Sequence, residues 1–341
     1  MNPRPLARAL VTSCVTALAI ALGGCGGDEP SEEAEPKWAI VHEGLDSSLM
    51  SVWGTSAADV WAVGSDSEDG PLILRWNGSE WRRLRSGSRG NLWWAFGFDN
   101  GPVYFGGSEG TILRFADGAF DTMYTPSTDT VFGIWGHSPD DMWAVGGSEG
   151  GGDRGFIWRL QNDEWVDVAG VAQAELSSKA LWKVQGSRAD DVWAVGTAGS
   201  ALHWDGCQLE LMNLGSGESL FTVHEAGGRF ATVGGFATGL LFENDGSGWS
   251  RRDEENLPGL VGVYLTDDGN GYAVGSFGAV VERKNDNWQQ IDGPLTSETL
   301  HAVWADPDGG LWTVGGQVQA HPLVRGVLAY RGNTIPKGPI R

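Results

Sequence analysis

The side chains that most often carry catalysis or metal binding are few in this 341-residue chain, and their spacing is irregular. The six histidines show neither His-x-His nor His-Glu-x-x-His spacing, so a zinc site has little support. Cys207 follows the Asp205-Gly206 turn in an acidic chain, with no base or cationic run beside it to activate a thiolate. Serine-nucleophile, P-loop and dinucleotide motifs are absent from the sequence, and the carboxylates are too numerous for spacing to nominate a hydrolase pair. We therefore predict a protein that is not an enzyme and that holds no cofactor and no metal.

Acidic residues recur in the polar turns before apolar runs, at Asp59, Asp140-Asp141, Asp190-Asp191, Asp267-Asp268 and Asp306-Pro307-Asp308. We expect these carboxylates to accept hydrogen bonds from turn amides. A calcium site is the alternative, and it needs several oxygens that converge within one loop. Only the segments 66–70 and 306–309 approach that pattern, so calcium stays an open but weaker possibility.

The N-terminus points to covalent lipid chemistry. Arg4 and Arg8 precede the apolar run 9–22, and Leu22-Gly23-Gly24-Cys25 resembles the lipobox of bacterial lipoproteins. The resemblance implies a signal peptide over residues 1–24 and a diacylglycerol thioether on Cys25 that anchors the chain to the lipid bilayer. Because Gly26 is not aspartate, the retention rule of these lipoproteins implies the outer membrane of a bacterial cell envelope. The alternative is an ordinary secretory signal that is cleaved near the same site.

Charge and composition narrow the class of partner. Residues 25–36 are acidic and carry no apolar side chain larger than alanine after the cysteine, which predicts a flexible tether. The formal net charge is −21, and without Arg4 and Arg8 it is 21 basic against 44 acidic residues, or −23. A nucleic acid partner needs clustered cations, so we exclude it. No pair of cysteines remains for a disulfide once Cys14 leaves with the signal and Cys25 carries lipid.

A leucine or valine, followed mostly by an aromatic residue four positions later and by glycine eleven positions after that, recurs seven times. The glycines run from 64 to 315 in six steps, a mean period of (315−64)/6, about 42 residues. The seven sets are Leu49/Trp53/Gly64, Leu92/Phe96/Gly107, Val131/Trp135/Gly146, Leu181/Gln185/Gly196, Leu220/His224/Gly235, Leu260/Tyr264/Gly275 and Leu300/Trp304/Gly315. A period of 40–45 residues is the length of one propeller blade.

Each repeat predicts a four-stranded antiparallel sheet. In the first repeat the β-prone runs are 49–53, 60–64, 72–76 and 80–84, and Asn77-Gly78 is a tight-turn pair between the last two. Both faces of the inner strands are apolar, so each sheet must be buried between two neighbours. The sequence therefore predicts an all-β fold, a seven-bladed β-propeller over residues 37–335, with almost no helix.

The ends of the chain are predicted to join in one blade. The last repeat supplies only three good strands, because the segment after Gly332-Asn333 contains two prolines. Lys37–Val41 reads like the fourth strands of the other repeats, so we expect it to be the outermost strand of the last blade and to close the ring. Residues 336–341 are left as a C-terminal tail.

The run from Ser51 to Trp81, with Val52-Trp53-Gly54-Thr55, Asp59-Val60-Trp61-Ala62-Val63-Gly64 and Leu74-Arg75-Trp76-Asn77-Gly78, resembles a known repeat. Bacterial extracytoplasmic propellers related to photosystem II assembly factors and to sialidase-type (BNR-like) proteins carry it. The resemblance covers residues 38–332 and implies binding and scaffold roles. The stretch Asn244–Trp249 departs from the sialidase Asp box in spacing, so sialidase chemistry is not carried over.

The least uniform repeat position lies directly after the repeat leucine, at the start of each innermost strand. It holds Met50, Trp93, Phe132, Trp182, Phe221, Val261 and His301. We predict that Met50, Trp93, Phe132, Trp182, Phe221 and His301 form a binding rim at one mouth of the central channel. The longest loops of the same face should be Ser65–Pro71, Gly147–Gly155 and Gly316–Arg325. The alternative is that these side chains only fill the core beside the channel.

These inferences lead to one functional expectation. The chain is predicted to be a monomeric, membrane-anchored, extracytoplasmic binding or scaffold protein that holds an unknown protein partner on one propeller rim. The competing expectation is a carbohydrate-binding or glycan-cleaving protein of the cell envelope, with Trp93 and Trp182 as stacking platforms. The absence of an acid/base pair and of an intact Asp box counts against that alternative.

Overall fold

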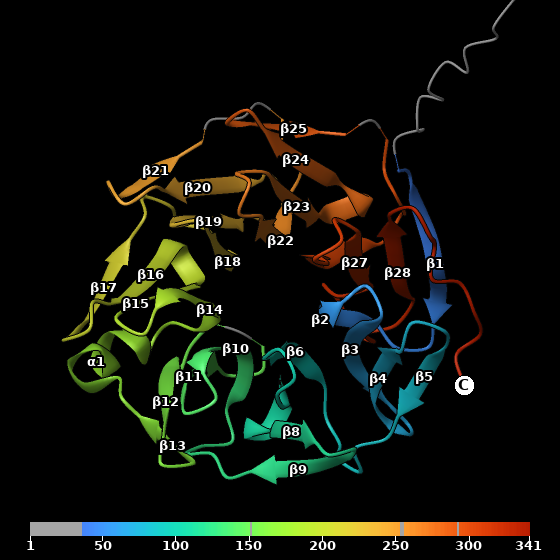
Figure 1. Cartoon of the computed structure of the whole chain (residues 1–341). Helices are drawn as coiled ribbons and strands as arrows, with labels where there is room; N and C mark the ends of the chain where they lie inside the picture. The colour runs from blue at the N-terminus through green and yellow to red at the C-terminus, as the bar shows by residue number, and fades with distance from the viewer. Residues whose placement is uncertain (1–35, 151, 253–255, 292) are drawn as a thin grey trace, which may run out of the picture. The chain divides into compact units, whose positions relative to one another are not determined.

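A computed structural model describes residues 36–150, 152–252, 256–291 and 293–341, and in these residues seven four-stranded antiparallel sheets form a ring of blades (Figure 1). The signal peptide predicted for 1–24, the lipidation site Cys25 and the tether up to residue 35 lie outside the described residues. The seven-bladed β-propeller predicted from the repeat is confirmed.

Within each blade the strands follow one another from the channel outward. Blades 1 and 2 contain β2 (Leu49–Ser56), β3 (Asp59–Ser67), β4 (Gly70–Trp76), β5 (Trp81–Leu84), β6 (Leu92–Gly97), β7 (Val103–Gly107), β8 (Ile112–Ala116) and β9 (Ala119–Met123). Blades 3 and 4 contain β10 (Thr130–Ser138), β11 (Asp141–Gly147), β12 (Phe156–Gln161), β13 (Glu164–Asp167), β14 (Leu181–Arg188), β15 (Asp191–Gly196), β16 (Ser200–Trp204) and β17 (Leu209–Asn213). Blades 5 and 6 contain β18 (Leu220–Ala226), β19 (Arg229–Gly234), β20 (Leu240–Asn244), β21 (Trp249–Arg251), β22 (Leu260–Leu265), β23 (Gly271–Gly275), β24 (Val280–Lys284) and β25 (Asn287–Gln290). Blade 7 contains β26 (Thr299–Ala305), β27 (Leu311–Gly316), β28 (Gly326–Arg331) and, outermost, β1 (Trp38–Leu45).

The N-terminal strand closes the ring, as predicted. β1 pairs antiparallel with β28, with Trp38 opposite Arg331 and Leu45 opposite Gly326. The strand is longer than the five residues expected from the sequence. Blade 7 is thus built from both ends of the chain and leaves no unpaired end of a blade to fray.

The last six residues, expected as a tail, lie along blade 1. Ile340 bridges Trp81 in parallel orientation, and the Arg83 amide donates to the carbonyl of Arg341 at 2.8 Å. The indole N–H of Trp81, which is fully buried, donates to the carbonyl of Pro336 at 2.9 Å. The chain therefore crosses from blade 7 to blade 1 at its C-terminus and adds a second connection between the first and last blades.

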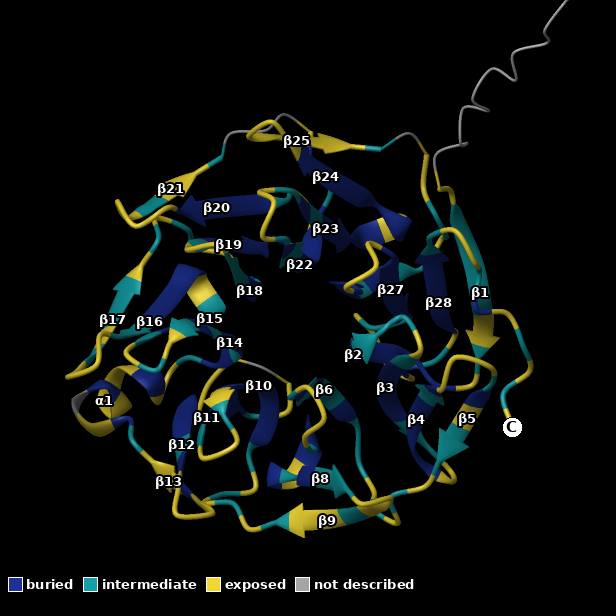
Figure 2. Cartoon of the chain, in the orientation of Figure 1, coloured by how far each residue is buried: buried dark blue, intermediate teal, exposed yellow. Residues whose placement is uncertain are grey.

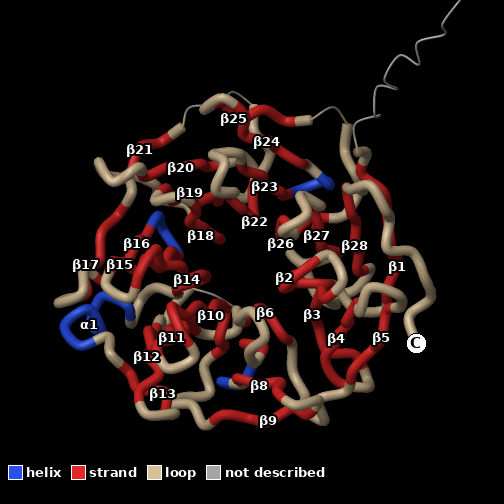
Figure 3. The backbone as a smooth tube through the Cα atoms, viewed as in Figure 1, coloured by secondary structure: helices blue, strands red, loops and turns tan. Residues whose placement is uncertain are grey.

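The tight turns follow the sequence. Asp117 and Gly118 have φ of 51° and 81°, and Asn162 and Asp163 have φ of 53° and 65°. Two consecutive positive φ values are those of the type I′ turn, which matches the twist of a β-hairpin. Helix is confined to α1 (Gln173–Leu176) and short 3-10 turns in the described residues (Figure 3), and no helix there is long and apolar enough to cross a bilayer.

The repeat glycine is required by close packing. A Cβ at Gly64 would lie 1.8 Å from the carbonyl oxygen of Ser48, and one at Gly146 would lie 1.9 Å from that of Thr130. In blade 5 the residue in this place is Gly234, opposite Leu220, so the assignment of Gly235 to the repeat is wrong by one position. The cause is the shorter β18–β19 hairpin, which turns at Gly227-Gly228.

The core lies between neighbouring blades, because both faces of the inner strands are apolar. Trp76, Trp81 and Trp312, for example, pack together where blade 1 meets blade 7. Figure 2 shows buried inner strands and outer strands that are partly or fully exposed around the ring. This rigid wall of sheets holds the first residues of the innermost strands around the channel.

Candidate functional site at the channel mouth

A β-bulge follows the repeat leucine or valine in every innermost strand. The register skips one residue between Leu49 and Ser51, and it does so in the same place in the other six blades. A bulged residue is left out of the strand ladder and its side chain is re-aimed. The skipped residues are Met50, Trp93, Phe132, Trp182, Phe221, Val261 and His301, the same seven that the sequence placed at the mouth.

Five of the six predicted rim residues line one hollow of about 390 Å³. They are Trp93, Phe132, Trp182, Phe221 and His301. Successive ring centroids are 5.4 Å apart from Trp93 to Phe132, 4.8 Å to Trp182 and 6.3 Å to Phe221. The aromatic side chains of four adjacent blades therefore form one continuous arc, which we call the mouth pocket together with its other lining residues.

Met50 is the exception, because its side chain is fully buried and does not line the pocket. Its carbonyl oxygen accepts a hydrogen bond from Nδ1 of His301 at 2.5 Å. Phe132 is only 3% exposed, whereas Trp93, Trp182 and Phe221 are partly exposed. The ring thus fills core at Met50 and Phe132 and offers accessible aromatic surface elsewhere.

Two of the three predicted loops border the pocket. Glu149 and Gly150 come from the loop between β11 and β12, and Val318–His321 with Leu323 come from the loop between β27 and β28. The prediction of a long loop at 65–71 is wrong. β3 and β4 continue to Ser67 and Gly70, where they close in a short turn, because Asp66 pairs with Pro71 and Ser67 with Gly70.

Lys183 is the residue of this site that the sequence analysis missed. It is 4% exposed and lines the pocket, and its Nζ donates to the carbonyl of Phe132 at 2.7 Å. The ammonium lies 4.6 Å from the ring centroid of Trp94, and no carboxylate of the described residues forms an ion pair with it. Burial lowers the pKa of Lys183 to about 7. The available signal was a lysine within the apolar run from Leu181 to Val184.

His301 faces the same pocket from blade 7. Burial lowers its pKa to about 3, and the nearby charge of Lys183 adds to the effect. The imidazole is therefore neutral at neutral pH, with its proton on Nδ1 where it donates to Met50. A neutral histidine beside a buried lysine leaves Lys183 as the main source of positive charge in the pocket.

The turn carboxylates, expected to bond turn amides, bind side chains across the blade in three cases, two of them arginines. Asp59 binds Nε of Arg75 and Asp141 binds Nε of Arg159, each at 2.8 Å. Each guanidinium also lies 4.8 Å from the ring centroid of a tryptophan in the second strand, Trp61 or Trp143. The arginine comes from the third strand of the same blade, so the carboxylate points across the sheet and not into its own turn.

Blade 4 repeats this arrangement with histidine in place of arginine. Asp191 binds Nε2 of His203 at 2.8 Å and the hydroxyl of Ser187 at 2.5 Å, and His203 stacks on Trp193 at 3.9 Å. In a nucleophilic triad the imidazole stands between hydroxyl and carboxylate, whereas here the carboxylate stands in the middle. Since arginines occupy the equivalent position in blades 1 and 3, this trio is a structural motif.

In each of the two segments that came nearest to a calcium loop, the first carboxylate is engaged. Asp306 accepts hydrogen bonds from the amide of Gly310 at 2.8 Å and from the indole of Trp312 at 2.9 Å. Asp66 pairs with Arg89 at 3.2 Å and accepts from the amide of Gly90 at 2.7 Å. In the part of the chain that the structure describes, no group of three or more histidine, cysteine or acidic side chains is gathered to hold a metal.

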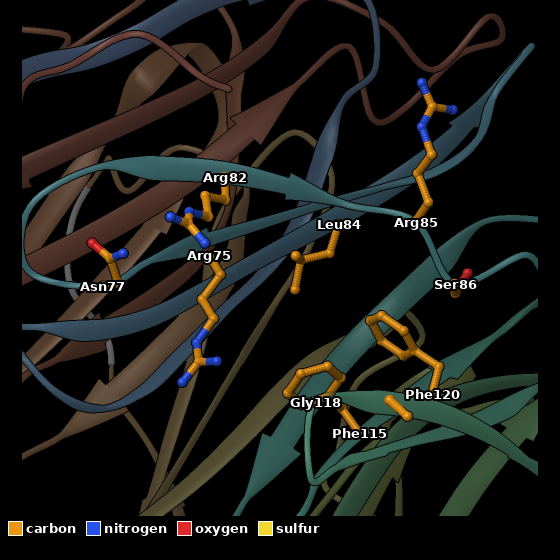
Figure 4. A pocket seen from close by; sticks show the side chains of 10 residues that line it. Arg75, Asn77, Arg82, Leu84, Arg85, Ser86, Phe115, Gly118 and Phe120 are labelled. Carbon is orange, nitrogen blue, oxygen red and sulfur yellow. The ribbon is translucent and has the colours of Figure 1, made fainter.

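A second hollow, of about 350 Å³, lies between the outer strands of blades 1 and 2 (Figure 4). It includes part of the basic run 82–85, and Phe115 and Phe120 form its other wall. Its arginines already have acidic partners: Arg75 pairs with Asp59, Arg82 with Glu80 at 2.5 Å and Arg85 with Asp69 at 3.0 Å. The mouth pocket, with its unpaired lysine, is the stronger candidate site.

Comparison with known proteins supports the propeller fold and does not identify a function. No family model matches the chain, and no curated protein sequence does. Among solved structures, a streptogramin B lyase matches with a TM-score of 0.67 at 14% identity, over 85% of this chain and 97% of that one. The WD40 β-propeller domain of Doa1 has a TM-score of 0.67 at 13% identity, over 89% of this chain and 100% of that one.

YCF48 bound to a D1 peptide matches with a TM-score of 0.65 at 13% identity, over 89% of this chain and 96% of that one. At these identities the likeness establishes a shared propeller architecture. The set includes an enzyme and proteins of other kinds, so the fold alone does not decide between catalysis and binding. The resemblance to sialidase-type propellers, inferred from the sequence, stays a prediction.

Proposed function

We propose that this protein is a lipid-anchored, extracytoplasmic binding protein of the bacterial cell envelope that holds a protein partner on the rim of the mouth pocket. The observation that supports it best is a pair of exposed phenylalanines beside that pocket. Phe236 is 59% exposed and Phe277 is 75% exposed. Large apolar side chains in that state are typical of protein-binding surfaces.

The two phenylalanines lie on neighbouring blades of the mouth face. Phe236 lines the pocket and its ring is 4.9 Å from that of Phe221. Ser276, which precedes Phe277, donates its amide to Gly259, and a Cβ at Gly259 would lie 2.1 Å from the carbonyl of Phe236. The side chain of Ser276 also reaches Gln319 of the loop 316–325. The segments that carry the two exposed rings therefore lie beside each other, and the mouth loop adjoins the segment of Phe277.

The side chain at Phe277 is unusual for its backbone conformation, because the equivalent turns of blades 2 and 4 have the same left-handed φ but carry Glu109 and Ala198. Its φ is 55°, in the left-handed region where glycine is favoured and a bulky residue is uncommon. Such a residue costs about 1 kcal/mol or more, and at 75% exposure its ring recovers little of that by packing. A bound partner that covers the ring offers a physical reason for its presence.

The rim is tested with the full-length protein as bait for envelope extracts and with matched variants. The double variant Phe236→Ser/Phe277→Ser should lose the partner that the wild type retains. Tyr124→Ser is the control, because Tyr124 is 84% exposed but lines a different hollow. If both variants retain the same partner as the wild type, the rim is not the docking surface.

The anchor rests on the sequence of residues 22–25 alone. Metabolic labelling with a palmitate analogue should label the wild type and leave the Cys25→Ala variant unlabelled and released from membranes. A Cys25→Ala protein that still labels and still sediments with membranes would refute the lipid anchor. The outer-membrane assignment is checked by separating the two membranes on a sucrose gradient.

Carbohydrate binding remains the second candidate from the sequence, but no contact in the described residues favours it over the rim. Trp93 and Trp182 both pack on Phe132, so part of each indole is unavailable to a sugar. Binding on a glycan array that is lost in the Trp182→Ala variant would favour this candidate instead.

A further inference from the structure

The mouth pocket has the size and chemistry of a small-molecule site. Its volume of about 390 Å³ falls in the range of ligand pockets, about 300–1,000 Å³. Its walls are mostly aromatic and aliphatic, with Trp93, Phe132, Trp182 and Phe221 on one side. The loop 316–325 supplies Val318–His321 and Leu323 on the other, so the pocket is bordered by both rigid strands and a loop.

Lys183 gives this apolar pocket a specific polarity. A buried ammonium is expensive unless it has a carboxylate or several acceptors, and lysine is almost never fully buried without a partner. Lys183 has one acceptor, the carbonyl of Phe132 at 2.7 Å, for its three N–H donors. Its other neighbour is the face of Trp94. The ammonium of Lys183 therefore has N–H donors at the pocket wall for which the described residues provide no acceptor.

Two further buried donors line the pocket. The indole N–H groups of Trp93 and Trp182 are buried and have no acceptor in the protein, although five other tryptophans of the described chain share that feature. His301 uses its N–H for Met50. Glu149, at the opening, accepts a hydrogen bond from Ser108 Oγ at 3.1 Å and is exposed. The interior therefore offers the Lys183 ammonium and two indole N–H groups as donors, with Nε2 of the neutral His301 as an acceptor, and a ligand that pairs with Lys183 must bring an acceptor of its own.

We propose that the mouth pocket binds a small molecule made of one apolar, preferably aromatic, body and a single carboxylate, which pairs with Nζ of Lys183. The body packs among Trp93, Phe132, Trp182 and Phe221. This site goes beyond the rim function, because it lies beneath the rim and does not need a protein partner.

The test compares two water-soluble probes of nearly equal shape, 1-naphthylacetate and its uncharged analogue 2-(1-naphthyl)ethanol, by calorimetry. The protein is the full-length chain in phospholipid nanodiscs, with empty nanodiscs as the blank. Because a hydrogen bond to a charged group contributes about 1.5–3 kcal/mol, the carboxylate should bind at least about 10-fold more tightly than the alcohol.

The Lys183→Met variant keeps the unbranched apolar stem of the side chain and removes its charged end. In this variant the carboxylate should lose its advantage while the alcohol binds as before, so that the ratio of affinities approaches one. Lys179→Met is the matched control, since Nζ of Lys179 binds Ser200 Oγ at 3.1 Å and the residue does not line the pocket. It should keep the wild-type ratio.

The number of protons taken up on ligand binding gives a second readout, because a lysine that only supports the fold would take up none. The titratable groups that face the pocket are Lys183, His301, Glu149 and His321. With a pKa of about 7, Lys183 is largely neutral at pH 8, and pairing with a carboxylate should draw one proton onto it. Titrations at pH 8 in two buffers of different ionisation enthalpy should show this uptake, and the Lys183→Met variant should not.

Two outcomes overturn the proposal. One is no binding of 1-naphthylacetate at millimolar concentration to a wild-type protein of normal melting temperature. The other is an equal preference for the carboxylate in wild type and Lys183→Met, provided that the variant keeps the circular dichroism spectrum of a folded protein. Neither outcome bears on the exposed phenylalanines, so the rim function can fail or stand separately.

Discussion

A buried cation between two neighbouring blades and the buried cation at the channel mouth differ in their partners. Arg283, 2% exposed, lies between blades 5 and 6 with Glu243 at 2.6 Å and Asp286 at 2.6 Å. Lys183 is buried to nearly the same degree at 4% exposure and has a single carbonyl. Scarcity of carboxylates does not explain the difference, since the chain has 44 acidic residues against 23 basic ones. A buried cation that serves the fold is paired within the fold, and the one that is not paired marks the site.

The largest effect is expected where the paired cation loses its partner. Glu243 is 3% exposed and also contacts Arg252 at 2.7 Å and the indole of Trp288 at 3.1 Å. In Glu243→Gln the guanidinium of Arg283 loses its buried counter-charge and keeps only the exposed carboxylate of Asp286, which should lower the free energy of unfolding by about 3–5 kcal/mol. Urea denaturation measures it. A loss below about 1 kcal/mol would mean that the ion pair with Glu243 matters little to Arg283, and the contrast with the unpaired Lys183 would fail.

The next effect concerns how stability depends on pH. The pKa of Lys183 is about 7 in the folded protein, against about 10.4 when unfolded. Between these values the unfolded chain binds more protons, so the contribution of Lys183 destabilises the fold increasingly as the pH falls from 10 to 7. The stability of Lys183→Met relative to wild type should therefore be higher at pH 7 than at pH 10, by about 2–4 kcal/mol. Denaturation curves of both proteins at the two pH values test this, and a constant difference would contradict it.

A smaller effect is expected at a partly exposed ion pair within one blade. Asp141 and Arg159 have side chains that are 20% and 26% exposed, so solvent screens their attraction. Asp141→Asn keeps the shape and removes the charge, and it should cost about 1 kcal/mol. The melting temperature should fall by a few degrees, less than for Glu243→Gln. An equal fall in the two variants would show that burial does not determine how much an ion pair contributes to stability.

The smallest effect is expected at the rim. Phe277→Gly relieves the left-handed backbone but makes the unfolded chain more flexible, and the two terms nearly cancel. The free energy of unfolding should change by less than about 0.5 kcal/mol while partner binding falls. A large destabilisation would show that the ring supports the fold, which would remove the argument for a docking surface.

Local patterns in the sequence were enough to predict the blades. The repeat leucine, the type I′ turns such as Asp117-Gly118 and the closing strand near Trp38 depend on neighbours a few residues away, or on a period that recurs seven times. The mouth ring was also predictable, because the bulge falls at the same repeat position in each blade.

The features that the sequence analysis did not predict depend on contacts between distant segments. The sequence around Lys183 indicates only a lysine in a strand. Its side chain is buried because it contacts Phe132 and Trp94, which belong to other blades. Asp141 was expected to bind its own turn, but its partner is 18 residues away, across the sheet. The shift from Gly235 to Gly234 came from one hairpin that is shorter than the rest. Such details need the three-dimensional partner, which spacing does not name.

The direction of β1 sets which side of the ring meets an anchor. β1 runs antiparallel to β28, and its end at Leu45 lies opposite Gly326, directly after the loop 316–325 that borders the mouth. Its beginning at Trp38 is therefore at the other face, where Pro36 lies beside the turns at Ser56–Ala58 and Asp308–Gly310. A chain held by lipid at Cys25 would join the ring at Pro36, on the face opposite the mouth pocket. Ligand and partner would then approach from the side turned away from the attachment, with no need for the ring to turn over.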